Sequence, residues 1–115
     1  MHVKYVLMFV ETEQYRKEWE AKDQAERDAA FEKVGRWFAE HAASITHSTQ
    51  LHPAAAATTV RLESGYEPIV TDGPFLEGKE VVSGYVEAEL DDLDEALRMA
   101  RSWPACPVVE VRPAL

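Results

Sequence analysis

Residues 70–79, which read V-T-D-G-P-F-L-E-G-K, contain the densest turn chemistry in the chain. Gly73 can adopt a positive φ angle, and Pro74 fixes its own φ and restricts the residue before it. The carboxylate of Asp72 can accept hydrogen bonds from nearby backbone N–H groups. We therefore predict a tight loop between two strands. Two interpretations of Asp72 stay open: it is part of the loop architecture, or the loop holds its carboxylate at the rim of a cleft.

Apolar residues on either side of this loop follow the periods of strands and helices. The predicted strands are residues 2–10, 44–51, 55–62, 66–71, 80–90 and 108–112. One predicted helix covers residues 24–42, with Phe31, Val34, Phe38 and His41 on its apolar stripe, and a second opens at residues 91–95, where Asp92 and Glu95 have capping-box spacing. A short helix within residues 11–23 is a further option, because Tyr15 and Trp19 are four residues apart.

Two glycines interrupt the predicted elements. Gly35 lies inside the long helix, where glycine costs about 1 kcal/mol relative to alanine, and we expect it to face the sheet or a neighbouring backbone. Gly84 lies in the middle of the strand at residues 80–90, which indicates a bulge or a close approach of another backbone.

This order of elements predicts one α+β domain, residues 1–115, with a ferredoxin-like arrangement of two helices on one face of a mostly antiparallel sheet. Two helices cover only one face of such a sheet. The other face also carries apolar residues, so we predict a homodimer in which a second subunit covers it by sheet-on-sheet packing.

Composition and charge exclude several classes of partner. The net charge is −9 and the basic residues are scattered, which disfavours nucleic acids and anionic membrane surfaces. No apolar run approaches the length of a membrane span, and no leader pattern precedes the first strand, so a cytoplasmic location is expected. The single cysteine, Cys106, fits a reducing compartment and is expected to be a small buried thiol rather than a nucleophile.

General acid–base chemistry requires a titratable group held in a pocket, and Asp72 is the best carboxylate for that role. His47 is its candidate partner, on a strand face shared with Ile45 and Thr49. The alternative is a structural or surface histidine. His41 is expected at a helix C-terminus or core edge. Metal binding is not predicted, because the sequence contains no H-x-x-x-H or C-x-x-C spacing, and no glycine-rich phosphate loop occurs.

Three further residues are candidates for substrate binding. Arg61 could hold a carboxylate through two hydrogen bonds, or could instead pair with a strand acid such as Glu87 or Glu89. Tyr85 could donate a hydrogen bond into a cleft, although an aromatic residue in a strand more often serves packing. The same two interpretations apply to Tyr5.

Six segments together resemble the YCII-related family, and specifically the branch named for its D-G-P-F motif. They are residues 2–8, 57–61, 71–80, 83–85, 91–96 and 109–113. Two departures from the family pattern place side chains where the family has glycines: Thr46-His47-Ser48-Thr49-Gln50, and Ser83 in place of the first glycine of a Gly-Gly pair.

The resemblance implies a dimeric ferredoxin-like protein of the α/β-barrel type. It places Asp72 at an inter-strand cleft near the dimer interface. Relatives in the wider family look like small enzymes that work without metal or organic cofactor, with a His–Asp pair as acid and base. The branch often occurs beside genes for alternative sigma factors. The expected function is therefore cofactor-independent chemistry on a small organic molecule. The alternative is a non-catalytic ligand-binding or protein-interaction module in a regulatory or stress context.

Overall fold

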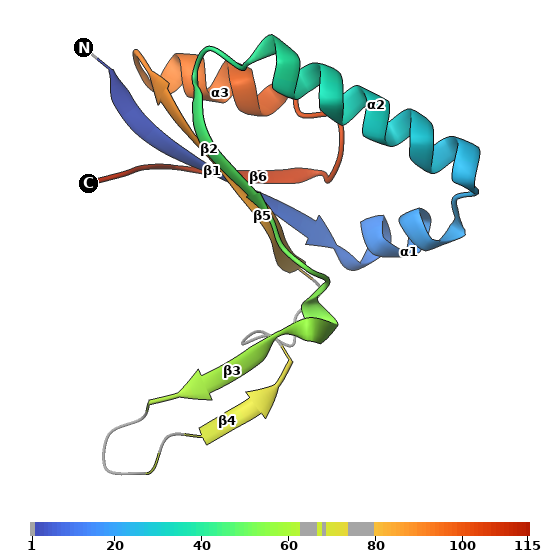
Figure 1. The fold of residues 1–115 in the computed structure, drawn as a ribbon. Coiled ribbons are helices and arrows are strands. Elements are labelled where there is room, and N and C mark those ends of the chain that lie inside the picture. The colour runs from blue at the N-terminus through green and yellow to red at the C-terminus, as the bar shows by residue number, and fades with distance from the viewer. Residues whose placement is uncertain (1, 63–66, 68, 74–79) are drawn as a thin grey trace.

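The computed structural model describes residues 2–62, 67, 69–73 and 80–115 and has the predicted α+β class (Figure 1). Its strands are β1 (Val3–Thr12), β2 (Ile45–Gln50), β3 (Thr58–Arg61), β4 (Ile69–Asp72), β5 (Glu80–Leu90) and β6 (Val108–Pro113). Its α-helices are α1 (Glu13–Ala21), α2 (Gln24–Glu40) and α3 (Leu93–Arg101), and a short 3-10 helix, η1, covers Ala54–Ala56. The structure thus contains one α-helix more than the two of the predicted fold.

Four strands form the main sheet in the order β2-β5-β1-β6, and every neighbouring pair is antiparallel. This arrangement is compatible with a ferredoxin-like fold. Figure 1 shows α2 and α3 on the same side of this sheet. None of the helices in the described part of the chain is long and apolar enough to cross a membrane.

Strands β3 and β4 were expected to join the main sheet, and this expectation is wrong. Among the residues that the structure describes, they pair with each other as a separate two-stranded sheet. Figure 1 shows this pair extending away from the main sheet. The bend has local causes: η1 follows Pro53 on one side, and Gly73 adopts a φ of 110° at the end of β4 on the other. The turn signal at Gly73 was therefore read correctly, but residues 74–79 of that stretch lie outside the described residues.

Side-chain caps start all three α-helices, and each is visible in the sequence. The Thr12 hydroxyl accepts a hydrogen bond from the Tyr15 N–H at 3.1 Å and so begins α1. Asp23 begins α2 with a full capping box, and Asp92 begins α3 by accepting from the Glu95 N–H at 2.9 Å. These bonds satisfy N–H groups that have no partner within a helix.

The core lies between the sheet and the helices α2 and α3. It is built around Trp37, which is the buried residue of α2 and contacts Phe9 of β1 and Trp103 after α3. Phe31 was expected on the same apolar stripe but is 55% exposed and packs on Trp19 of α1. Figure 1 shows why: the N-terminal part of α2 lies beside α1, not over the sheet.

Gly35 does not face the sheet or a neighbouring backbone, so that expectation is wrong. A Cβ atom built on it has no atom within 4 Å, and its φ is not positive. We therefore expect Gly35→Ala to raise the free energy of unfolding by about 0.8–1 kcal/mol, the helix-propensity difference. The urea midpoint at unchanged m-value measures this, and a lower midpoint would contradict it.

Candidate functional site

The sheet has one face without helices, which we call the open face. Residues directly opposite each other on neighbouring strands share a face. Leu7 and Val86 form such a pair in the core, so the alternate pair Met8 and Tyr85 lies on the other side. The open face includes Lys4, Val6, Met8, Val10, His47, Thr49, Val82, Tyr85, Glu87, Glu89, Val108, Glu110 and Arg112. These are described side chains available for chemistry on the uncovered side of the sheet.

His47 and Tyr85, two of the predicted site residues, are brought together on this face. The Nε2 atom of His47 is 3.0 Å from the Thr49 hydroxyl and 3.4 Å from the Tyr85 hydroxyl. The ring centroids of His47 and Tyr85 are 5.8 Å apart. Thr49 and Tyr85 are direct cross-strand partners, so the β2–β5 pairing itself assembles the cluster. We call His47, Thr49 and Tyr85 the histidine cluster.

Two hydroxyl groups therefore share a single ring nitrogen. The nitrogen can accept from one hydroxyl when it is unprotonated and can donate to one when it is protonated. In either state one hydroxyl keeps a hydrogen-bonding position for a ligand. An imidazole oriented in this way can accept or donate a proton to a bound molecule.

The strand face predicted for His47 needs one correction. Ile45 was expected beside His47 and Thr49, but the β2–β5 register shifts between Ile45 and His47. Ile45 pairs with Ala88 and packs on the core, whereas His47 pairs with Glu87 on the open face. A β-bulge adds one residue to a strand, which breaks the simple alternation of faces.

Two open-face residues near His47 were not predicted as site residues. Thr49 could have been found from its spacing of two residues from His47, which places both side chains on one side of a strand. Glu87 lies directly opposite His47 in the strand register and is a nearby carboxylate. From the sequence, Glu87 was predicted only as an alternative partner for Arg61.

Asp72 and Arg61, by contrast, lie on the β3–β4 pair. Asp72 pairs with Thr58, and Arg61 pairs with Ile69. Because side chains alternate along a strand, Asp72 is on the face of the Val60–Val70 pair and Arg61 is on the opposite face. The two predicted residues are therefore not brought together.

Asp72 also stands in a different sheet from His47. Among the described residues, no hydrogen bond or ion pair joins Asp72 to a histidine. The strand partner of Arg61 is β4, so the alternative pairing with Glu87 or Glu89 gains no support from the sheet register. Within one chain, the predicted acid–base pair is not assembled.

Tyr5, the fifth predicted site residue, belongs to the core. Its exposed fraction is 7%, and it pairs with Ala88 on the helix-covered side of the sheet. Of the two interpretations of Tyr5, this position fits packing in the core, and it places Tyr5 on the face opposite His47. Alternation along a strand separates its two faces but does not tell which one the helices cover.

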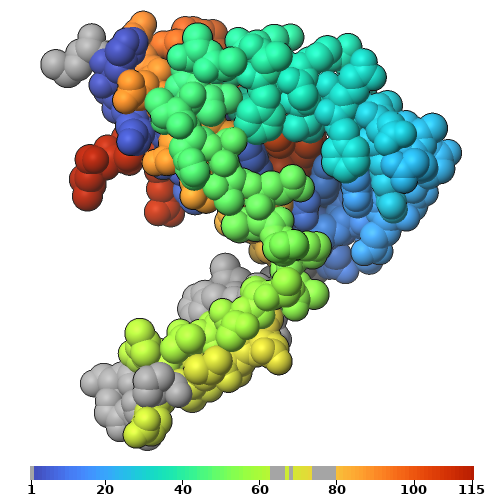
Figure 2. Space-filling model, viewed as in Figure 1, coloured from blue at the N-terminus to red at the C-terminus, as the bar shows by residue number. Residues whose placement is uncertain are grey.

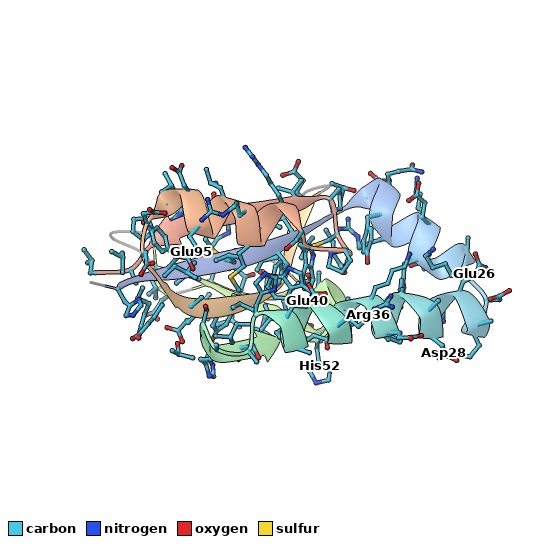
Figure 3. The ribbon with its side chains drawn as sticks, turned by 90° about the horizontal axis from the view of Figure 1, so that it is seen from above. Glu26, Asp28, Arg36, Glu40, His52 and Glu95 are labelled. Carbon is cyan, nitrogen blue, oxygen red and sulfur yellow. The ribbon has the colours of Figure 1, made fainter. Side chains whose placement is uncertain are left out.

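The remaining histidines and the cysteine have structural or solvent positions. His41 caps α2, with its Nδ1 atom 2.8 Å from the Trp37 carbonyl oxygen. His52 is exposed and points outward in Figure 3. The Cys106 thiol is buried and accepts a hydrogen bond from Trp103 at 3.3 Å, and burial raises its pKa, which disfavours the reactive thiolate.

Two hollows on the described surface lie away from the histidine cluster. The larger, of about 600 Å³, lies between α1 and α2 and is lined by residues that include Tyr15, Trp19, Lys22 and Lys33. Figure 3 shows the charged side chains Glu26, Asp28, Arg36 and Glu40 distributed along α2. Within the residues that the structure describes, no group of three or more histidine, cysteine or acidic side chains could hold a metal ion.

Comparison with known proteins gives one relative and no function. No protein-family model matches the chain. The chain is 44% identical, over 68 residues, to an uncharacterized protein of Rhizobium meliloti (strain 1021). The match covers 56% of this chain and 54% of that protein, so the chain spans about half the length of this relative.

Proposed function

We propose that the protein is a homodimer that binds a small organic molecule on the open face, with His47 as acid or base in a reaction that needs no cofactor. The observation that carries the proposal is the position of the His47 Nε2 atom, 3.0 Å from the Thr49 hydroxyl and 3.4 Å from the Tyr85 hydroxyl. A reacting group held by its neighbours costs less to orient at the moment of reaction.

The homodimer is supported by the lack of helices on the open face of the sheet. Helices α2 and α3 lie on one side, and the open face carries the apolar side chains of Val6, Met8 and Val10. A second subunit packed against this face gives the dimeric α/β-barrel arrangement implied by the resemblance to the YCII-related family and its D-G-P-F branch. It also removes water from the histidine cluster, which strengthens the electrostatic interactions there.

Ligand-induced stabilisation tests the proposal. A panel of small carboxylic acids and carbonyl compounds is added to the wild-type protein, and the melting temperature is recorded. A compound that occupies the site at a hundred times its Kd should stabilise the protein by about 2.7 kcal/mol. We expect His47→Gln and Tyr85→Phe to remove most of this stabilisation.

His52→Gln is the matched control, because His52 is exposed and lies outside the histidine cluster. It should leave the ligand-induced shift unchanged. If the stabilising compounds raise the melting temperature of wild type and His47→Gln equally, the ligand binds outside the histidine cluster and the proposal is overturned.

A second candidate is a non-catalytic ligand-binding or protein-interaction module in a regulatory or stress context. The observation that favours it is that two hollows on the described surface are both lined by residues outside the histidine cluster. Under this alternative a compound binds without being converted. Incubation of each stabilising compound with the protein, followed by mass spectrometry of the small molecule, separates the two. Both candidates fit a cytoplasmic location, in which the single thiol stays reduced.

A further inference from the structure

The β3–β4 pair, residues 58–61 and 69–72, forms a projecting ribbon that we call the arm. It continues the antiparallel β2–β5 pair beyond the bend at η1 and Gly73. On one face of the arm, Val60 and Val70 are direct partners, with exposed fractions of 51% and 63%. The arm therefore presents a pair of β-branched apolar side chains to solvent.

All four residues of β4 and the Val60 side chain of β3 are exposed, so no part of the chain that the structure describes buries this face of the arm. An isolated two-stranded hairpin is marginally stable in water, because it buries too little apolar surface. The radius of gyration is 16.4 Å, whereas a compact domain of this length has about 13 Å. Figure 2 shows the arm standing away from the body, with a broad notch between them. A second element is needed to bury the Val60–Val70 pair.

The open face carries a second set of apolar side chains without cover from the helices, Val6, Met8 and Val10, together with charged residues such as Lys4 and Glu87. A two-fold dimer repeats each surface, so the arm of one subunit can cover the open face of the other and the reverse. The area that two open faces would bury against each other also favours a contribution from the arms. Four strands spaced at about 4.8 Å over about six residues present a face of roughly 400 Å². Two such faces together bury roughly 800 Å², less than the ~1,200 Å² at which stable specific interfaces begin.

We infer that the arm of one subunit packs its Val60–Val70 face on the open face of a second copy of the chain. The inference rests on the homodimer of the proposed function and adds how the dimer is held. The arms contribute the contact area that two flat sheet faces lack. Strand β4 gains apolar cover that it does not have in a single chain, where all four of its residues are exposed.

The same packing makes the candidate site composite. Asp72 is on the arm face that carries Val60 and Val70, so docking this face brings its carboxylate to the open face of the partner. The histidine cluster lies on that open face. Each site then takes His47, Thr49 and Tyr85 from one subunit and Asp72 from the other. This accounts for the separation of Asp72 and His47 within one chain.

A pair of arm variants tests the docking face. Val60→Thr/Val70→Thr keeps the β-branched shape, and therefore the strand propensity, while making the docking face polar. We expect it to raise the dimer Kd at least tenfold in a sedimentation-velocity dilution series. Ile69→Thr is the control, because Ile69 is also exposed, at 50%, but lies on the opposite face of the arm. It should leave the dimer Kd unchanged within about twofold.

Isotope-filtered NOESY spectra of a dimer mixed from labelled and unlabelled chains test the contact directly. We expect intersubunit contacts from the methyl groups of Val60 and Val70 to those of Val6 and Met8. A wild-type protein that is monomeric at all concentrations overturns the homodimer and the arm together. If the protein is a dimer but these contacts are absent, or if the Val60→Thr/Val70→Thr and Ile69→Thr variants change the dimer Kd equally, only the docking of the arm is overturned. The dimer could also show these contacts while the ligand-induced shift in melting temperature is the same for wild type and His47→Gln. That result overturns the proposed function but not the docking of the arm.

Discussion

Trp37→Ala is expected to lower the free energy of unfolding by about 3–5 kcal/mol. The side chain is 2% exposed and sits between the sheet and α3. Its ring packs edge-on against Trp103, with centroids 4.9 Å apart, and its Nε1 atom donates to the Met99 carbonyl oxygen at 3.2 Å and the Ser102 hydroxyl at 2.9 Å. Alanine at this position leaves a cavity, and the Met99 carbonyl oxygen and the Ser102 hydroxyl lose the hydrogen bonds that Trp37 donates. Urea denaturation measured by circular dichroism gives the change.

Two further variants make this result interpretable. Trp37→Phe keeps a ring in the core and removes only the N–H group, so we expect a smaller loss of about 1–2 kcal/mol. Trp19→Ala is the matched control. Trp19 is half-buried and contacts Phe31 and Arg27 at the end of α2 that lies beyond the sheet. It should cost about 1–2 kcal/mol. Equal losses for Trp19→Ala and Trp37→Ala would show that the core is not centred on Trp37.

Features set by neighbouring residues could be predicted from the sequence. The capping residues Asp92 and Glu95 act on backbone groups within one turn, so their spacing alone identifies the start of α3. Gly73 was recognised for the same reason, since its positive φ is a property of its own backbone. The apolar stripe of α2 was placed less well. Its period is local, but only packing decides that Trp37 is buried and Phe31 is not.

Features set by distant pairing could not be predicted. The bulge between Ile45 and His47 depends on the register against β5, which begins thirty-five residues after Ile45. It moved Ile45 to the core and left His47 on the open face. The separate β3–β4 pair was not predicted for a similar reason. Both strands have ordinary strand composition, and composition does not determine which strands pair with each other.

The candidate site also combines features set by neighbouring residues with features set by distant pairing. His47 and Tyr85 were both proposed, and the β2–β5 pairing places them in contact on the open face. Tyr5 was proposed on equal grounds, but it lies in the core. Asp72 was predicted as a site residue because of the turn residues that follow it, which is a signal from neighbouring residues. In the proposed dimer its relation to His47 depends on how two chains pack, which no pattern within one chain encodes.

Gly84→Ala is expected to lower the free energy of unfolding by about 1–3 kcal/mol. A Cβ atom on Gly84 would lie 2.7 Å from the Thr49 carbonyl oxygen and 3.4 Å from the Gln50 Cα atom. Both are backbone atoms, so no side chain can rotate away, and β2 itself has to move. The register shift between Phe9 and Val10 opposite this glycine confirms that the strand is irregular here. Urea denaturation measures the loss, with Gly35→Ala as a glycine-to-alanine control of opposite sign.

The same variant connects the sheet to the histidine cluster. Strand β2 is at the edge of the sheet and pairs only with β5, so a displaced β2 carries His47 and Thr49 away from Tyr85. We expect faster amide hydrogen exchange in β2 than in the β1–β6 pair, and an altered His47 ring signal in NMR spectra. If Gly84→Ala matched Gly35→Ala in sign, or if β2 exchanged no faster than β6, the close approach of the Thr49 carbonyl would not constrain this edge of the sheet.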